Sequence, residues 1–169
     1  GNRRRSKRGE ALFRAGDRVD TLYAGRLGVL KSSVRSSDGR EQVTNFFMAG
    51  EMSGFDGIAS GGHSCDVTAL EDTEVCVINY DKFEEAATSM RSMGAHVLKM
   101  LSREIVRQHG VMLLLGSMHA EERLAAFLLS LSQRFEQRGY SRSEFVLRMT
   151  RAEIGSYLGL KLETVSRVL

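Results

Sequence analysis

The chain has 169 residues, of which 42% are hydrophobic, enough for a packed core in one or two small domains. Its formal net charge is +3, and basic residues gather near both ends, as in residues 3–8, which suits either a polyanionic partner or a solvated face. No apolar stretch is long enough for a membrane span or a signal peptide, and two cysteines are too few for a disulfide framework. We therefore expect a globular, cytoplasmic protein that does not contact membranes.

The first half of the chain has the pattern of a β-domain. Short runs rich in β-forming residues alternate with turn signals that contain glycine, and we expect strands at residues 21–23, 28–34, 42–48, 65–70 and 74–79. Closely spaced short strands of this kind are typical of a small antiparallel barrel or jelly roll. The sequence predicts an α+β protein that begins with an antiparallel β-barrel or jelly roll over residues 1–89.

Glycines become rarer after residue 81, and the apolar period becomes helical. Helices are expected at residues 81–89, 90–116 and 120–138. The long helix over 90–116 has two apolar faces, which implies two neighbours. One face, with Met93, Val97, Met100 and Val111, can pack on the β-domain. The other face follows the a/d spacing of a coiled coil at Leu98, Leu101, Ile105, Gln108, Met112 and Leu115. It predicts either a dimerisation helix or a helix buried within one chain.

The last twenty residues have the pattern of a helix-turn-helix. Thr150 and Glu153 form a T-x-x-E capping box at the start of a helix. Gly155 leaves room for a second helix to cross closely, and Gly159 can adopt the positive φ of a sharp turn. Apolar residues such as Ile154 form the buried side, which makes residues 117–169 a candidate DNA-binding domain.

The polar residues of this segment are suited to DNA. Side chains that can hydrogen-bond base edges or phosphates are Thr150, Lys161, Glu163, Thr164, Ser166 and Arg167. An ordinary surface hairpin with a glycine turn is the alternative. Because proteins of this type usually bind two half-sites as symmetric pairs, the pattern favours the dimer for the long helix.

Features of an enzyme are missing from the sequence. The four histidines have no metal-ligand spacing, and no nucleophile elbow, Walker loop or dinucleotide motif occurs. His63 and Cys65 could face one metal ion, but nothing supplies further ligands. A third alternative is a protein-interaction module that uses only the β-domain. This alternative gives the helix-turn-helix no role.

The order of these elements resembles the CRP/FNR family of bacterial transcription regulators, and within it the oxygen-responsive FNR branch. The resemblance covers essentially the whole chain. It is carried by Leu12-Phe13-Arg14-Ala15-Gly16-Asp17, Leu22-Tyr23-Ala24, Gly54-Phe55-Asp56, Leu113-Leu114-Leu115, Ala120-Glu121-Glu122-Arg123-Leu124-Ala125-Ala126-Phe127 and Glu163-Thr164-Val165-Ser166-Arg167.

The resemblance implies that Glu163, Ser166 and Arg167 read a TTGAT-like half-site in double-stranded DNA. Lys161 departs from the family, which often has a small hydroxyl residue there. RNA polymerase is the implied partner in activation, through a turn that contains Asp38, Gly39 and Arg40. Arg40 replaces an acidic residue of that turn, which puts this contact in doubt.

The resemblance also implies a [4Fe-4S] cluster held by four cysteines, of which Cys76 matches the one in the β-domain. We expect the other three, and the rest of the winged helix, in parts of a longer protein. Gln108 replaces an acidic residue of the family and implies a dimer that is less sensitive to oxygen. Cyclic nucleotide binding is not expected, because Ser64-Cys65 stands where the family's phosphate-binding arginine is needed. The alternative is a family member that senses another signal or none, with Cys76 as a core residue.

Overall fold

The computed structural model describes residues 2–169. The chain forms two compact units, Gly1–Met100 and Leu101–Leu169. Their border lies within one long helix, α2 (Arg91–Ser117), which contributes residues to both units.

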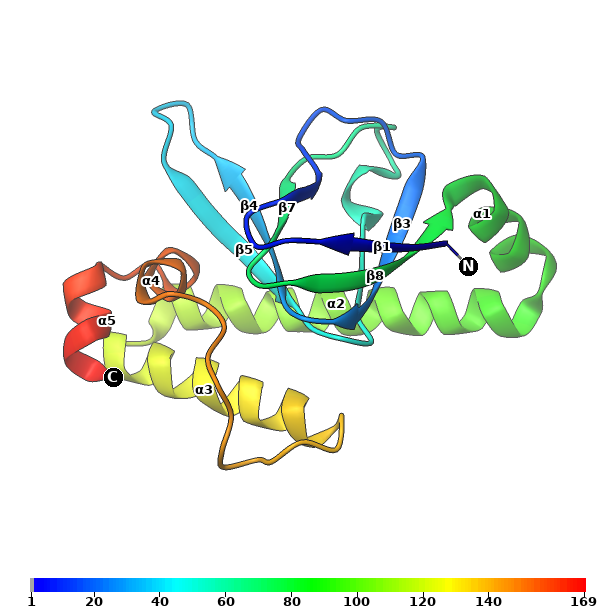
Figure 1. The fold of residues 1–169 in the computed structure, drawn as a ribbon. Helices are drawn as coiled ribbons and strands as arrows, with labels where there is room; N and C mark the ends of the chain where they lie inside the picture. Colours follow the sequence, from blue (N-terminus) through cyan, green and yellow to red (C-terminus); the bar gives the residue numbers. More distant parts are fainter. Residues whose placement is uncertain (1) are drawn as a thin grey trace. The chain divides into compact units, whose positions relative to one another are not determined.

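The first unit contains two four-stranded antiparallel sheets, with the orders β1-β8-β3-β6 and β2-β7-β4-β5 (Figure 1). The predicted β-domain is therefore confirmed, as a jelly roll of two sheets and not a closed barrel. Its strands are β1 (Asn2–Ser6), β2 (Ala11–Phe13), β3 (Thr21–Leu27), β4 (Leu30–Arg35), β5 (Glu41–Phe47), β6 (Met52–Ser53), β7 (Asp66–Ala69) and β8 (Thr73–Asn79).

Alternation along the strands decides which side chains form the core. In β8, Val75 is buried and Val77 packs on the same apolar cluster, which includes Phe13 and Tyr23. Because successive side chains of a strand point to opposite faces, Cys76 between the two valines lies on the other face of the sheet. This places one cysteine of the chain outside the core of the jelly roll.

Five predicted strands correspond to β3, β4, β5, β7 and β8, while β1, β2 and β6 were missed. β1 contains three consecutive arginines and has no apolar alternation, yet it pairs along β8 from Asn2 to Ser6. Its charges have partners within the unit. The Arg5 side chain lies 3.3 Å from Glu74, and that of Arg4 donates to the carbonyls of Ala11 and Leu12. These two arginines of the basic run are thus part of the fold.

The predicted helices are present with small shifts in their bounds. α1 covers Tyr80–Ser89, α3 covers Ala120–Glu136, α4 covers Arg151–Leu158 and α5 covers Leu162–Val168. A single-turn 3-10 helix, Phe55–Gly57, follows β6. Within residues 2–169, none of the helices combines the length and apolar character needed to cross a membrane.

The first turns of α2 use one apolar face within the first unit. That face borders a cavity of about 360 Å³ between the helix and the jelly roll. The side chains around it include Met93, Val97 and Met100 from α2, together with Met52, Ile78 and Phe83. The three predicted residues Met93, Val97 and Met100 therefore lie toward the β-domain with this cavity between them, and Val111 is not among the residues that line it.

Candidate DNA-binding and sensor sites

The helix-turn-helix begins at the predicted capping box. The Glu153 backbone N–H donates to Thr150 Oγ1 at 3.2 Å, and the Thr150 backbone N–H donates to Glu153 Oε2 at 2.7 Å. These bonds satisfy backbone groups that a helix start leaves without partners. Behind the cap, Ile154 and Leu158 are fully buried and anchor α4 in the second unit.

Two glycines fix how the second helix follows the first. A Cβ atom on Gly155 would lie 2.6 Å from the Leu160 carbonyl oxygen, so only glycine allows this close approach. Gly159 ends α4 in the left-handed region, with φ of 64°. Val165 of α5 is fully buried near Gly155. The predicted turn is confirmed, and α4, the turn and α5 pack as one piece.

The outward side of α5 carries the predicted polar residues. Glu163, Ser166 and Arg167 are exposed, and Thr164 is half-buried. Lys161 is exposed at the N-cap position of α5 and makes no side-chain capping bond, as expected for a residue without a short acceptor group. Exposed donors and acceptors on one short helix, supported by a buried apolar side, can meet the edges of base pairs.

The second apolar face of α2 is open to solvent in the single chain. Leu98, Ile105 and Met112, spaced seven residues apart, are 70%, 56% and 71% exposed. Leu101 and Gln108 are half-buried, and Leu115 is 36% exposed. The exposed Val106 and Leu113 extend the patch beyond the residues that the heptad pattern identified. A soluble helix rarely leaves so many large apolar side chains uncovered.

Gln108 has a partner on its own helix. Its Nε2 donates to Glu104 Oε1 at 2.8 Å, and the Arg107 guanidinium also pairs with Glu104. The carboxylate beside the exposed face is thus neutralised within one turn of α2. The face presents apolar groups and a neutral amide.

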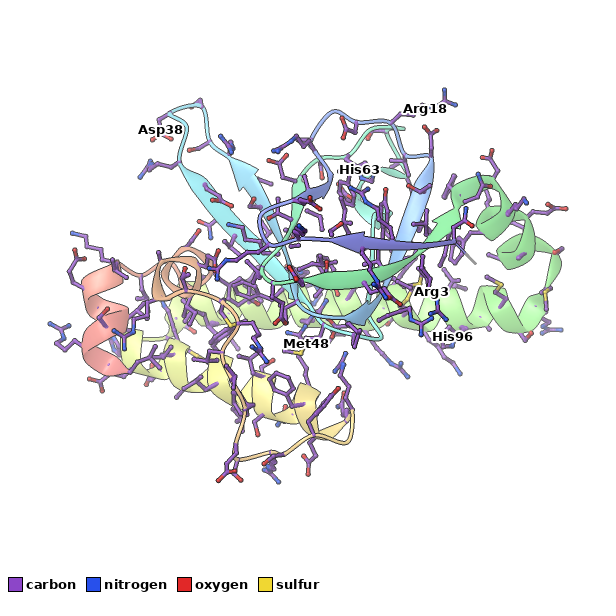
Figure 2. The ribbon with its side chains drawn as sticks, in the orientation of Figure 1. Arg3, Arg18, Asp38, Met48, His63 and His96 are labelled. Atoms are coloured by element: carbon purple, nitrogen blue, oxygen red, sulfur yellow. The ribbon has the colours of Figure 1, made fainter. Side chains whose placement is uncertain are left out.

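A polar cluster forms where buried His63 of the jelly roll, labelled in Figure 2, meets the more exposed Asp56. His63 Nδ1 lies 3.0 Å from Asp56 Oδ1, and its ring stacks on Phe13. Asp56 Oδ2 accepts the Ser64 backbone N–H at 2.7 Å. Burial raises the pKa of the Asp56 carboxyl, but the hydrogen bonds from His63 and Ser64 outweigh this and leave that pKa below its ordinary value.

Cys65 belongs to the same cluster. Its Sγ lies 3.5 Å from Asp56 Oδ2, and burial together with this carboxylate raises the pKa of the thiol to about 12. The thiol therefore stays protonated at neutral pH, which disfavours metal binding. No group of three His, Cys, Asp or Glu residues among 2–169 is placed to hold a metal ion. The structure does not support the metal pair of His63 and Cys65 that their spacing had suggested.

Cys76 has different surroundings. It is half-buried, and its Cα is paired with Arg3 in β1 and with Ala24 in β3. The two cysteines are not joined by a disulfide. Cys76 is thus a thiol on the outer face of the sheet, and the described residues bring no second cysteine to it.

The turn between β4 and β5 carries Asp38, Gly39 and Arg40. Figure 2 shows Asp38 at the tip of this hairpin. Arg40 Nε lies 2.6 Å from Asp38 Oδ2, and the Ser36 hydroxyl also donates to Asp38. The hydrogen bonds from Ser36 and from the Arg40 backbone lower the pKa of Asp38. The tip therefore presents an ion pair and not a free negative charge.

Comparison with known proteins agrees with this division of the chain. Residues 3–89 match the cyclic nucleotide-binding domain family, and residues 122–169 match the Crp-like helix-turn-helix domain family. The transcriptional regulatory protein btr of Bordetella pertussis is 46% identical over 97% of this chain and 68% of its own length. The fumarate and nitrate reduction regulatory protein of Escherichia coli K12 is 45% identical over 96% of this chain.

The chain spans 65% of the length of that Escherichia coli relative. Among solved structures, FixK2 from Bradyrhizobium japonicum matches with a TM-score of 0.89 at 31% identity, over 99% of this chain and 81% of that chain. These relatives are similar to both units and to the helix that joins them. The chain belongs to the CRP/FNR family, whose members are DNA-binding transcription regulators and not enzymes.

Proposed function

We propose that this chain is part of a dimeric, FNR-type regulator that reads TTGAT-like half-sites with α5. The observation that carries the proposal is the row of exposed polar side chains on α5. Val165, on the opposite side of the same helix, is buried and holds α5 in the second unit. The relative named fumarate and nitrate reduction regulatory protein supports the choice of branch. We also propose the cytoplasm as its location, since a DNA-reading regulator has to reach the chromosome.

Each exposed side chain of α5 suits one kind of contact. Arg167 can donate to O6 and N7 of guanine, Glu163 can accept from the amino group of cytosine, and Ser166 can serve either role. Lys161 and Thr150 lie at the helix starts, where phosphate contacts set the register. Thr164 is half-buried, so we assign its methyl group a supporting contact at the edge of the row.

Titration of full-length protein against a TTGAT-n4-ATCAA duplex, followed by fluorescence anisotropy, tests this proposal. Arg167→Ala should cost about 1–3 kcal/mol on this duplex and leave binding to a scrambled duplex nearly unchanged. Lys161→Ala is the matched control, because loss of a phosphate contact should weaken both duplexes alike. Equal losses for Arg167→Ala on both duplexes would show that Arg167 touches only the backbone.

We propose that the exposed face of α2 is the dimer seam. Its apolar members Leu98, Ile105 and Met112 share one side of the helix, and Gln108 adds no charge to it. Ile105→Glu should convert the dimer to monomer in sedimentation, because it places two carboxylates opposite each other in the seam. Arg103→Glu, on an exposed part of the same helix outside the heptad positions, should remain a dimer. An unchanged dimer for Ile105→Glu would mean that another surface holds it together.

We propose Cys76 as one ligand of an iron-sulfur cluster in the intact protein. A Cys₄ cluster needs four thiolates, and the described residues offer one, so they do not fit a complete cluster. The position of Cys76 supports a single ligand, since its side chain is half-buried on the outer face of the sheet and not packed in the core. Loss of iron from Cys76→Ser in anaerobically purified full-length protein tests this assignment. Unchanged iron would favour a regulator that senses another signal or none.

We propose that the jelly roll does not bind a cyclic nucleotide, although its family is described as a cyclic nucleotide-binding domain. Asp56 already takes the backbone N–H of Ser64, and its negative charge would repel a phosphate. The His63 ring fills the adjacent space against Phe13. Millimolar cyclic AMP should leave the melting temperature unchanged, and a rise of several degrees would contradict this assignment.

We propose the hairpin tip at Asp38, Gly39 and Arg40 as a contact for RNA polymerase. The Asp38–Arg40 ion pair makes this tip neutral. Arg40→Ala would free the carboxylate, and in-vitro transcription from a two-half-site promoter should then change while DNA affinity does not. Unchanged transcription would remove the tip from the polymerase contact.

A further inference from the structure

One side chain in the second unit joins three helix ends. Arg123 lies on α3, and each of its three guanidinium nitrogens donates to a different backbone carbonyl (Nε to Met118 at 2.9 Å, Nη1 to Leu158 at 3.0 Å and Nη2 to Leu115 at 3.0 Å). Leu115 belongs to the last turn of α2, Met118 to the connection after it, and Leu158 is the final residue of α4. In the sequence, Arg123 stands out only as part of the Glu121-Glu122-Arg123-Leu124 stretch that resembles the family.

Two of these carbonyls, those of Leu115 and Leu158, need such a partner because they lie in the last turns of α2 and α4. The last four C=O groups of a helix have no donor within the helix, and the C-terminal end carries a partial negative charge. A guanidinium has five N–H donors in a fixed plane and stays charged, so it can serve several carbonyls at once. A lysine ammonium is a single point charge on a flexible stem and cannot reach all three in this arrangement.

The contact lies directly before the turn of the helix-turn-helix. Gly159 follows Leu158, and a Cβ atom on Gly159 would lie 3.3 Å from Arg123 Nη1 and 3.5 Å from Leu115 Cδ2. The turn is therefore packed on the Arg123 guanidinium and on the end of α2. Since α4, the turn and α5 pack as one piece, a group that holds Leu158 also sets the direction of α5.

We propose that Arg123 is a positioning residue that fixes the recognition helix α5 relative to the end of α2, and thereby sets the spacing between half-sites that the dimer accepts. This inference rests on the proposed function, in which α2 forms the dimer seam and α5 reads DNA. Leu115 connects the two, because it is the last residue of the seam and its carbonyl accepts from Arg123. In the dimer, each α5 is tied to the shared helix pair through one Arg123.

Spacing preference is the property that tests this role. Full-length wild type, Arg123→Gln and Arg123→Lys are titrated against duplexes with two half-sites separated by three, four, five or six base pairs, and against a single half-site. One added base pair moves a half-site by about 3.4 Å and rotates it around the duplex, so a rigid dimer should discriminate by at least about tenfold. Both variants should reduce this discrimination to about threefold or less, with single half-site affinity within about twofold of wild type.

Arg138→Gln is the matched control. Arg138 also carries a guanidinium, just after the end of α3, and its Nη1 donates to the Arg134 carbonyl four residues back in the sequence. It should keep the spacing preference of wild type. Retention of that preference by Arg123→Gln would overturn the inference, and so would full rescue by Arg123→Lys, because charge alone would then suffice. If Arg123→Gln lost as much affinity for the single half-site as for the paired half-sites, the inference would also be overturned. Such a loss would indicate that α5 itself is damaged.

Amide hydrogen exchange separates this inference from the half-site proposal. Arg123→Gln should speed exchange of the Gly159 and Leu160 amides, which donate to Gly155, by at least about tenfold, with the α3 core around Leu131 unchanged. If wild type does not bind the TTGAT duplex, the half-site proposal fails, while faster exchange at Gly159 still supports the anchor. Unchanged exchange at Gly159 and Leu160 overturns the role of Arg123 whatever the DNA titration shows.

Discussion

Cys65 and Cys76 lie in the same jelly roll and face opposite environments. Cys65 is buried beside Asp56 in the interior, and its thiol pKa is raised to about 12. Cys76 is half-buried on the outer face of β8, one residue from core Val75. Cys65 lies in a bend just before β7, whereas Cys76 lies within β8, so each cysteine acquires its chemistry from the place that the fold gives it. Within β8, a one-residue register shift would turn Cys76 toward the core.

The charged groups near the two cysteines also differ in their partners. Beside buried His63 and Cys65, the Asp56 carboxylate is held by His63 and by the Ser64 backbone, so its oxygens are used by the fold. On the outer face, Glu74 meets the side chains of Arg5 and Arg26, each at 3.3 Å, and the local balance is positive. Positive charge near the half-buried Cys76 agrees with the proposal that this residue is a thiolate ligand.

The largest expected difference between Cys65 and Cys76 is in the rate at which their thiols are alkylated. With a pKa of about 12, only about one Cys65 thiol in 10⁵ is ionised at pH 7, and the side chain is also covered. In iron-free native protein, iodoacetamide should therefore modify Cys76 at least about 100-fold faster than Cys65, as followed by peptide mass spectrometry. In urea both should react alike, which is the control. Equal native rates would mean that the interior opens freely.

Asp56→Asn should cost about 2 kcal/mol of unfolding free energy at pH 7, because the amide cannot accept the same set of charge-assisted bonds. The folded-state pKa of Asp56 is lowered, so its stabilisation is complete above the unfolded value of about 3.9 and is lost as pH falls through the folded value. The gap between wild type and variant in urea unfolding should thus close in acid. A pH-independent gap would point to packing alone.

Asp20→Asn provides the control for this prediction. Asp20 pairs with Arg18 on the surface, with 68% of its side chain exposed. Such an exposed ion pair contributes little, so the variant should lie within about 0.5 kcal/mol of wild type at every pH.

Replacing either cysteine by alanine should change the free energy of unfolding only slightly. Cys65→Ala removes a buried sulfur and its contact with Asp56, and should cost about 1 kcal/mol in urea unfolding. Cys76→Ala in iron-free protein should cost less than about 0.5 kcal/mol, because its side chain is half-buried outside the core. A larger loss for Cys76→Ala would show that Cys76 supports the fold and would weaken its assignment as a ligand.

The parts of the molecule that sequence predicted well are those with local signals. The capping box at Thr150 and the two glycines at 155 and 159 act over a few residues, so the helix-turn-helix was predicted nearly to the residue. Strands with glycine turns were likewise found. β1 was missed because its stabilisation comes from pairing with β8 and from Glu74, about seventy residues away in the chain.

Arg123 and Asp56 have no local sequence pattern that predicts their contacts. Arg123 donates to backbone carbonyls, and any residue type can supply a carbonyl, so its partners cannot be identified from side chains. In the sequence Asp56 stands out only within the Gly54-Phe55-Asp56 stretch that resembles the family, and its contact with His63 requires the 3-10 turn and the following loop to fold together. Contacts of this kind depend on tertiary structure.

Iron content distinguishes whether Cys76 or Cys65 is the cluster ligand. Full-length wild type, Cys76→Ser and Cys65→Ser are purified without oxygen, and iron per protomer is measured together with absorbance near 400 nm, about where Cys₄ clusters absorb. We expect Cys76→Ser to lose iron and colour, and Cys65→Ser to keep both. Iron retained in Cys76→Ser, or lost only in Cys65→Ser, would contradict the assignment of the outer face of β8 as the sensing side.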